Sequence, residues 1–564
     1  MYFLDHLSNL KHSQQTCFVH RNNPITWQSY FQNCSKFSKS LQKYSITKNV
    51  AIMGFNSPQW FTAAVGAIIN GNTYTGIYPT NGPDEVEHIF NTCDTEILVI
   101  QNTKLLESIQ LKNKLKLIIL YDEEPAIKFH NQIPIKTFQE FIGEANLLTL
   151  PNLSRNPNDI ITYIMTSGTT SRSKAVEISY ENISFTCSKM TKIYDLQNER
   201  IVSYLPLSHI AASMLDIFCH FYHQGTIYFA KPDALQGTLV DTLKEANPTV
   251  FLAVPRVWEK IMEKMQVTAA QKYEGTIGQI LKKIMDFAKR KALEFHDAKM
   301  NQQEISKLTI VIYNICKIIF FRKIKNAIGL NSCKYFLSGA APISKNVLDY
   351  FTQIDVVIYE IFGMSETCAI ISGSNPTNYR KGSVGKPLIG EIKIANDGEI
   401  LYKGKNNFIG YRNNPTATKE TLQNQWLHTG DVGHIDKDGF LFITGRKKEL
   451  IITAGGENVA PVLIEQQIKK FAPNISQVVI IGDQKKFLSC LVTFTNKQNN
   501  PQEYIQQAIN KYNEKPISKA QKIQKFSILN EDFTIENDCM TPTMKLKRSI
   551  IQKKFKSQID AMYN

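Results

Sequence analysis

The fold of this sequence is decided by the segment Thr166-Ser167-Gly168-Thr169-Thr170-Ser171-Arg172-Ser173-Lys174-Ala175. It combines hydroxyl side chains with a glycine and one lysine. The short apolar segment from Asp159 to Met165 predicts a strand before it, and Asn182 is the expected N-cap of a helix after it. Backbone N–H groups, hydroxyls and a lysine between a strand and a helix are donors that bind polyphosphate. The segment therefore predicts a phosphate-binding loop.

A Walker A loop, with the pattern G-x-x-x-x-G-K-[ST], is the obvious competing interpretation. Counting from Gly168 puts Ser173 where the second glycine belongs and Ala175 where the magnesium-binding Ser or Thr belongs. The Walker interpretation therefore fails at two positions. Standing alone, the segment would be explained more simply as a polar surface loop.

Further motifs follow the loop in a fixed order over nearly the whole chain. They are Ser338-Gly339-Ala340-Ala341-Pro342, Tyr359-Glu360-Ile361-Phe362-Gly363-Met364-Ser365-Glu366-Thr367, Trp426-Leu427-His428-Thr429-Gly430-Asp431, Gly445-Arg446-Lys447-Lys448-Glu449-Leu450 and Thr541-Pro542-Thr543-Met544-Lys545-Leu546-Lys547-Arg548. Each has an ordinary alternative, such as a core position for Phe362 or a solvated side chain for Lys545. In this order, together with the loop, they resemble the adenylate-forming superfamily, which includes acyl-CoA synthetases.

The resemblance implies an ATP site with magnesium, and it assigns roles to individual residues. Lys545 would be the catalytic lysine, and Thr166 and Glu366 would hold the magnesium ion, with Glu366 also counted as catalytic. Asp431 would accept hydrogen bonds from both ribose hydroxyls. The implied ATP-binding residues are Thr166, Ser167, Gly168, Thr169, Thr170, Lys174, Gly339, Ala340, Phe362, Gly363, Ser365, Asp431, Arg446, Lys448 and Lys545.

The sequence departs from the family pattern T-S-G-T-T-G-x-P-K-G-V at three positions of the loop. Ser171, Ser173 and Ala175 replace the usual Gly, Pro and Gly. These replacements change the stiffness of the loop and put the geometry of the pyrophosphate clamp in question. Gly445 stands where many relatives carry Asp, which predicts a looser hinge between the domains.

Four other segments, 76–81, 206–212, 254–260 and 451–458, resemble long-chain and bubblegum-type acyl-CoA synthetases. That resemblance implies a ligase that converts ATP, a fatty acid and coenzyme A into acyl-CoA, AMP and diphosphate through an acyl-adenylate. His209 would line the acyl site and Trp258 would gate it, whereas a packed loop histidine and a core tryptophan are the simpler explanations. Other carboxylic acids and a catalytically silent nucleotide-binding member stay open.

The expected architecture is α/β, with a large N-terminal domain of layered sheets and helices at 1–444. A lysine-rich, apolar stretch at about 259–331 predicts a helical insertion in that domain. Turns at Asp397-Gly398 and at Asp436 to Gly439 predict β-hairpins. A small, mobile α+β domain at 445–564 would carry the catalytic lysine.

Composition excludes several classes of protein. Hydrophobic residues make up 43% and charged residues 20% of the 564 positions, which argues against a disordered or fibrous chain. The net charge of +15 suits ATP, coenzyme A or an anionic membrane. Because the lysines and arginines are spread along the chain, we expect no nucleic-acid binding.

The sequence also predicts where the protein works. Ten cysteines without a C-x-x-C pair, and a start without a secretory pattern, predict an intracellular protein, cytoplasmic or peripherally bound to the cytoplasmic face of a membrane. His220 and His223 have metal-compatible spacing but no recognisable partners, so packed or surface histidines are expected. Leu308 to Phe321 is too short and polar to span a bilayer, which leaves core packing or membrane-surface contact.

Overall fold

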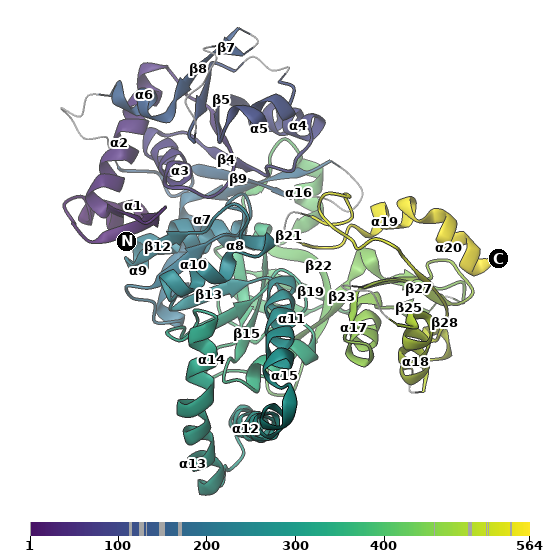
Figure 1. Ribbon diagram of the computed structural model, residues 1–564. Coiled ribbons are helices and arrows are strands. Elements are labelled where there is room, and N and C mark those ends of the chain that lie inside the picture. The colour runs from purple at the N-terminus through teal and green to yellow at the C-terminus, as the bar shows by residue number, and fades with distance from the viewer. Residues whose placement is uncertain are drawn as a thin grey trace.

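The computed structural model describes residues 2–111, 115–122, 129–130, 132–145, 153–166, 172–455, 457–494, 499–514, 516, 518–541 and 544–564. A large α/β region takes up most of the chain, and a smaller α+β region, coloured yellow-green to yellow, lies beside it (Figure 1). The predicted division into a large N-terminal part and a small C-terminal part is confirmed.

The largest sheet has nine strands, of which six are parallel. Alternate residues of its central strands face two separate cores: Val50 and Ile52 pack into one, and Ala51 and Met53 into the other. Burial on both faces explains their continuous apolar sequences. The strands are β3 (Asn49–Met53), β4 (Tyr74–Ile77), β5 (Thr95–Ile100), β6 (Leu117–Leu120), β7 (Phe129–His130), β8 (Ile133–Thr137), β9 (Ile160–Thr166), β10 (Lys174–Ser179) and β20 (Gly410–Tyr411).

Helices cover this sheet on both sides. They are α2 (Trp27–Lys43), α3 (Pro58–Asn70) and α6 (Phe138–Gly143) on one core, with α4 (Pro83–Cys93) and α5 (Thr103–Ser108) on the other. A capping box at Thr137 starts α6, and Ser57 caps α3 through its side chain.

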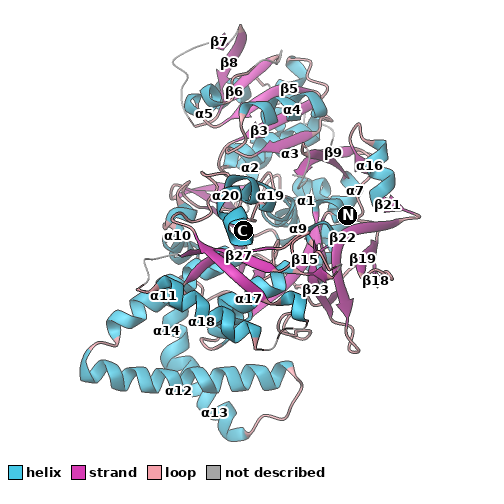
Figure 2. Cartoon of the chain, turned by 90° about the vertical axis from the view of Figure 1, so that its right-hand side faces the viewer, coloured by secondary structure: helices cyan, strands magenta, loops and turns pink. Residues whose placement is uncertain are grey.

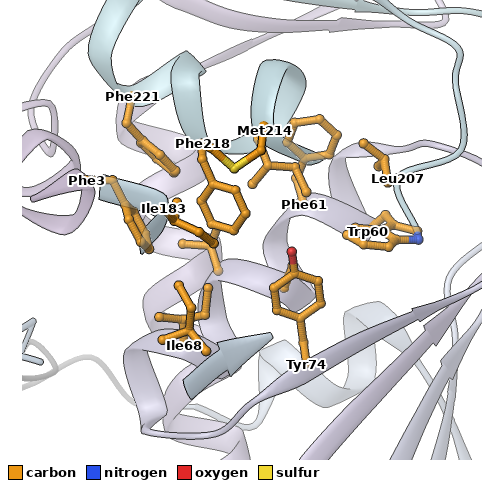
Figure 3. Close-up of a cluster of buried hydrophobic side chains, with 14 of the residues drawn as sticks. Phe3, Trp60, Phe61, Ile68, Tyr74, Ile183, Leu207, Met214, Phe218 and Phe221 are labelled. Atoms are coloured by element: carbon orange, nitrogen blue, oxygen red, sulfur yellow. The ribbon is translucent and has the colours of Figure 1, made fainter. Parts of the chain in front are cut away.

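A four-stranded sheet and its helices form the second layer. Its strands are β1 (Thr16–His20), β2 (Asn23–Thr26), β11 (Arg200–Ser203) and β12 (Thr226–Phe229). The surrounding elements are α1 (Phe3–Asn9), α7 (Tyr180–Ile193), α8 (Ile210–Ala212), the π-helix η1 (Ser213–Phe218), α9 (Cys219–His223), η2 (Ala234–Gln236) and α10 (Leu239–Ala246). Figure 3 shows the core where these helices meet α3, with Phe61 facing Met214 and Phe218.

A five-stranded sheet forms the third layer, and parallel pairing runs from β13 to β15. Its strands are β13 (Val250–Ala253), β14 (Tyr335–Ser338), β15 (Ile358–Met364), β16 (Ala369–Gly373) and β17 (Lys386–Pro387), with α15 (Lys345–Thr352) and η4 (Ser365–Thr367). Between β13 and β14 the chain forms α11 (Pro255–Lys272), α12 (Gly275–Met300), α13 (Lys307–Cys316), the π-helix η3 (Lys317–Phe321) and α14 (Arg322–Ala327). These helices fill the stretch in which the sequence predicts an insertion. We call residues 275–327 the helical arm; α12 crosses the bottom of the molecule in Figure 2.

A strongly twisted antiparallel sheet completes the large region. It contains β18 (Glu391–Ile394), β19 (Glu399–Lys403), β21 (Leu422–Gln423), β22 (Trp426–Ile435) and β23 (Leu441–Arg446), with α16 (Pro415–Thr421) alongside. Both hairpins predicted from their turn residues are confirmed, because β18 pairs with β19 and β22 with β23.

The elements that follow β23 form the small domain. A three-stranded sheet lies at its centre, and two separate apolar clusters pack against that sheet. The elements are η5 (Lys447–Glu449), β24 (Ile451–Ile452), β25 (Asn458–Val459), α17 (Pro461–Phe471), β26 (Ile475–Ile481), β27 (Leu488–Phe494), α18 (Pro501–Asn513), η6 (Lys519–Gln521), β28 (Ile523–Ile528), α19 (Arg548–Lys554) and α20 (Lys556–Tyr563).

Two local predictions around the phosphate loop are wrong. The loop does not lead directly into a helix, because β10 follows it and pairs antiparallel with β9. The helix N-cap is Ser179 and not Asn182: the Ser179 side chain accepts a hydrogen bond from the Asn182 N–H. Asn182 is the third residue of the helix, and its side-chain Oδ1 accepts a hydrogen bond from the Ser179 N–H. The two hydrogen bonds form a capping box.

The histidine, cysteine and membrane expectations have clear outcomes. His220 and His223 are both buried and packed in the core, as the simpler explanation predicts. All ten cysteines are free. Within the described part of the chain, every helix is too short or too polar to cross a bilayer. Core packing explains only one face of the segment from Leu308 to Phe321, since Leu308 is 69% exposed.

Candidate active site

A cavity of about 840 Å³ lies where the large region meets the small domain. Its walls come from the ends of β9, β14 and β15, from β22 and β23, and from the segment around Lys545 of the small domain. Ligands of open α/β sheets bind at the carboxyl ends of parallel strands, and β13, β14 and β15 end at this cavity.

One end of the cavity is polar and presents Glu366 next to the phosphate loop. The Tyr411 hydroxyl donates a hydrogen bond of 2.7 Å to Oε1 of Glu366. The Lys174 ammonium lies 4.7 Å from the centre of the Tyr411 ring, and the Thr166 hydroxyl donates to the Lys174 carbonyl oxygen over 3.4 Å. A carboxylate, a hydroxyl and an ammonium group therefore share one wall.

Asp431 and Arg446 form an ion pair at the cavity, where Arg446 lines the wall and Asp431 lies behind it. The β22–β23 ladder places them directly across from each other, and Arg446 Nε lies 2.9 Å from Asp431 Oδ1. Burial raises the pKa of the Asp431 carboxyl, and the charges of Arg446 and Lys545 oppose that change. Thr429 orients the aspartate locally, because its hydroxyl accepts a hydrogen bond from the Asp431 N–H.

Lys545 reaches the cavity from the small domain. A tight turn fixes it: the Thr541 N–H donates to the Lys545 carbonyl oxygen over 2.8 Å, and the Lys545 N–H donates to the Thr541 hydroxyl over 3.0 Å. Burial, assisted by the neighbouring Arg446, lowers the pKa of Lys545 to about 8, although nearby carboxylates act in the opposite direction. A cation that is incompletely compensated in this way favours an anionic ligand.

Two backbone turns shape the space between these walls. Ala340, two residues after the end of β14, has φ of +70°, and a Cβ added at the intervening Gly339 would lie 2.9 Å from Ile361 Cγ1. A Cβ at Gly363 would lie 1.5 Å from the Ala369 carbonyl oxygen, so only glycine fits there. Phe362, beside that glycine, lines the cavity, and its side chain belongs to the buried cluster with Ile371 and Ile400.

The other end of the cavity is apolar and continues into the large region. His209 stands at the junction, where it caps α8 and accepts a hydrogen bond from the Ala211 N–H at Nδ1. Burial, with Lys545 nearby, lowers the pKa of His209 to about 3, so the ring is neutral at physiological pH. The inner wall includes Met190, Tyr194, Leu196, Met214, Val250 and Leu252.

Family models match both parts of the chain. The AMP-binding enzyme model matches residues 7–412, and the AMP-binding enzyme C-terminal domain model matches residues 448–564. The chain belongs to the AMP-binding enzymes. The resemblance drawn from the motifs is thereby confirmed.

Curated relatives of this AMP-binding enzyme include the long-chain-fatty-acid–CoA ligase ACSBG2 of Xenopus laevis, 38% identical over 96% of this chain and 80% of the relative. The long-chain-fatty-acid–CoA ligase ACSBG1 of Homo sapiens is 35% identical over 96% of this chain and 81% of the relative. The subclass resemblance to bubblegum-type ligases is confirmed by these relatives.

Solved structures show the same fold. The anthranilate CoA ligase AuaEII in complex with anthranoyl-AMP superposes with a TM-score of 0.78 at 18% identity, over 99% of this chain and 98% of that one. The o-succinylbenzoate CoA synthetase MenE of Bacillus subtilis, in complex with ATP and magnesium ion, gives 0.69 at 19% identity over 97% and 98%. At these identities the likeness concerns the fold alone.

The structure brings most of the site residues predicted for this AMP-binding enzyme to one cavity. Asp431 lies directly behind the wall, paired with Arg446. Ser167, Gly168, Thr169 and Thr170 lie outside the described residues. The residues that line the cavity are Thr166, Lys174, His209, Gly339, Ala340, Phe362, Gly363, Ser365, Glu366, Arg446, Lys448 and Lys545.

Trp258 is not brought to the cavity. Its side chain is fully buried and packs edge-on against Phe251 and Phe351 at centroid distances of 5.2 and 5.0 Å. The indole N–H donates to the carbonyl oxygen of Leu337, which does line the cavity. The structure therefore supports the core explanation of Trp258, whose side chain lies one layer behind the cavity wall at Leu337.

Sequence reasoning missed two residues that support the site. Tyr411 holds Glu366 through its hydroxyl, but only the pairing of β10 with β20 brings it there from a distant part of the chain. Glu449 lines the cavity and accepts from Arg548 Nε over 3.3 Å, while Arg548 also pairs with Glu465 at 2.6 Å. The only sequence signal for these ion pairs of Arg548 was its position three residues after the predicted catalytic lysine.

The donors at the polar end fit a magnesium–ATP complex. Magnesium prefers oxygen ligands and keeps phosphate oxygens and water in its shell, so one carboxylate and one hydroxyl suffice as protein ligands. Glu366 and Thr166 supply those groups on one wall. Lys545, Arg446 and Lys448 also line the cavity and would supply positive charge for the phosphates.

Proposed function

We propose that this enzyme activates a long-chain fatty acid with ATP and transfers the acyl group to coenzyme A. The observation that carries the proposal is a single cavity that is polar, with charges of both signs, at one end and apolar at the other. A fatty acid seated in the apolar end would place its carboxylate at His209, next to Lys545. The curated ligases that the chain resembles act on long-chain fatty acids by name.

In the first half-reaction, a carboxylate oxygen of the fatty acid attacks the α-phosphorus of ATP and diphosphate leaves. The Lys545 ammonium donates hydrogen bonds to the phosphate oxygens on which negative charge increases. Stabilising that charge lowers the energy of the transition state. Glu366 and Thr166 would hold the magnesium ion, which neutralises charge on the phosphates. Asp431 would accept the ribose hydrogen bonds and so fix the position of the α-phosphorus.

The neutral His209 has a separate role at the junction. Because its pKa is near 3, it brings no positive charge that would compete with Lys545 for the phosphates. We assign it hydrogen bonding to the carboxylate of the fatty acid, with the aliphatic chain on the apolar wall. The wall residue Leu337 is supported from behind by Trp258.

In the second half-reaction, the thiolate sulfur of coenzyme A attacks the acyl carbonyl carbon and AMP leaves. Lys545 is no longer needed at the phosphate, and we propose that the small domain, residues 445–564, rotates about Gly445 to admit coenzyme A. Gly445 has space for such a change, since a Cβ placed there meets Ala460 Cβ at only ordinary contact distance, 3.6 Å.

The test is magnesium- and ATP-dependent release of diphosphate over fatty acids of graded length, followed by addition of coenzyme A and detection of acyl-CoA. Turnover that is greatest on long chains is expected. Release on amino or aryl acids instead would assign another adenylating activity. ATP binding without release on any acid would indicate that the replacements at Ser171 and Ser173 have silenced the clamp.

We further propose that the enzyme is intracellular and works at the surface of a membrane, without crossing it. The support is chemical, because a long-chain fatty acid partitions into bilayers through its apolar chain. An enzyme that binds the membrane surface meets its substrate there at high local concentration.

A further inference from the structure

The helical arm exposes an unusual amount of apolar surface. Among the residues that the structure describes, fifteen large apolar side chains are exposed, and eleven of them lie on the arm. They are Ile277, Ile280, Leu281, Ile284, Phe287, Leu308, Ile310, Val311, Ile315, Ile318 and Ile319. A concentration of exposed apolar side chains on one part of a folded domain marks a surface that binds something.

On α12 the exposed residues form one stripe. Ile277, Ile280, Ile284 and Phe287 follow each other at spacings of three and four residues, so they share one side of the helix. Their exposed fractions range from 41% to 76%. Ala288, four residues after Ile284, is fully buried on the same side of the helix, so this side of α12 is exposed in its first half and packed against the body in its second half.

A second stripe runs along α13 and η3. Leu308, Val311, Ile315 and Ile318 have the same spacing, and each is at least 51% exposed. This stripe ends at Arg322, which is the next residue at helical spacing and is exposed. Both stripes are thus exposed, apolar and flanked by cations.

Side-chain contacts attach the arm to the body of the enzyme, so its exposed side chains have a defined arrangement. Phe295 of α12 stacks on Tyr313 of α13 at 4.0 Å between ring centroids. The buried carboxylate of Asp355 accepts from the Tyr313 hydroxyl over 2.5 Å and pairs with Lys325 at 2.7 Å and His296 at 3.1 Å. These contacts join α12, α13 and α14, and α12 and α13 lie at the lower end of the molecule in both views (Figures 1 and 2).

The charge of the arm selects its partner. Residues 275–327 contain eleven lysines and arginines against four acidic residues, in a chain whose net charge is +15. Lys282 and Lys283 sit beside the first stripe, and Arg322 and Lys323 follow the second; all four are exposed. A second copy of the chain would place like charges opposite each other, which opposes self-association through this face. A bilayer with anionic headgroups offers apolar depth and negative charge together.

We propose that the outer face of the helical arm docks on an anionic lipid bilayer. Ile280, Ile284, Leu308 and Val311 insert among the acyl chains, and the flanking lysines bind the headgroups. This inference rests on the proposed function only for the benefit of docking, which is access to a fatty acid in the bilayer. Lipid binding itself is measured separately from catalysis.

The test is co-sedimentation of the full-length enzyme with vesicles of phosphatidylcholine, alone or mixed with phosphatidylserine, at low and high salt. Binding is expected on the mixed vesicles and is weakened by salt. The pairs Ile280→Ser with Ile284→Ser, and Leu308→Ser with Val311→Ser, are each expected to weaken binding by about tenfold or more, since each removes two aliphatic anchors. Lys282→Glu with Lys283→Glu should weaken binding to the mixed vesicles selectively.

Matched controls use exposed residues elsewhere. Ile452→Ser with Leu463→Ser removes two apolar side chains of the small domain, 51% and 38% exposed. Lys48→Glu with Lys437→Glu makes the same charge change at exposed sites away from the arm. Both should bind like the wild type. Equal losses in arm and control variants, or no sedimentation of the wild type on mixed vesicles, would overturn the proposal.

Two further measurements separate the alternatives. Light scattering reports the oligomeric state, and a dimer that the Leu308→Ser, Val311→Ser variant dissolves would assign the face to a second copy instead. Diphosphate release on a fatty acid supplied as monomers is expected to be unchanged in the arm variants. Vesicle binding by an enzyme that activates no fatty acid would overturn the proposed function and leave the docking surface standing.

Discussion

Replacing Lys545 with methionine should make the enzyme more stable and much less active. Methionine keeps the length of the apolar stem but removes the buried charge. The pKa of Lys545 falls from 10.5 to about 8, so keeping the ammonium in the folded, ligand-free site costs roughly 3 kcal/mol below pH 8. The Lys545→Met variant avoids that cost. Loss of one charge-stabilising donor should slow adenylation by about 10²-fold or more.

The sign of the pH dependence follows from the lowered pKa. Between about pH 8 and 10.5 the unfolded wild type binds more protons at this lysine than the folded one does, so wild-type stability rises with pH. The advantage of the Lys545→Met variant should therefore be largest near neutral pH and shrink toward pH 10.5. Thermal unfolding without ligands measures it, with Lys553→Met, at an exposed lysine of α19, as the control.

Activity is assayed in two halves. Diphosphate release reports adenylation, and formation of acyl-CoA from supplied acyl-adenylate reports the second step. The Lys545→Met variant should lose the first and keep most of the second. An equal loss in both half-reactions would refute a specific role of Lys545 in adenylation. Unchanged thermal stability at neutral pH would refute the inference that the Lys545 charge is buried and incompletely compensated.

Three other variants test neighbouring parts of the argument. Tyr411→Phe removes the 2.7 Å hydrogen bond to Glu366 and should slow adenylation by about two- to tenfold, most at limiting magnesium; an unchanged magnesium requirement would contradict this. Lys469→Ala breaks the 3.1 Å pair with Glu259 that joins the small domain to α11 and should slow adenylation by about fivefold, while acyl-CoA formation from acyl-adenylate stays normal. Trp258→Ala should lower stability by about 3–5 kcal/mol with chain-length preference unchanged; a stable variant with a shifted preference would restore the gating role.

The sequence predicted which residues meet at the cavity better than it predicted the local structure around them. Glu366, Arg446 and Lys545 were found from motifs far apart in the chain, and the fold brings all three to one cavity. The prediction that a helix directly follows the phosphate loop was wrong, because the segment after the loop is the strand β10, which pairs with β9 and β20. The cap at Ser179 followed from that strand, which ends where the helix begins.

The sequence by itself therefore determined features that depend on nearby residues. These are the motifs and their residue types, the two hairpin turns, and the helical spacing between 275 and 327. Only the tertiary structure decided burial. It put Trp258 behind the cavity wall at Leu337, lowered the pKa of Lys545 and left Leu308 in solvent. The physical reason is that helical or strand spacing shows which residues share a face, whereas the solvent exposure and electrostatic surroundings of that face depend on segments distant in the chain.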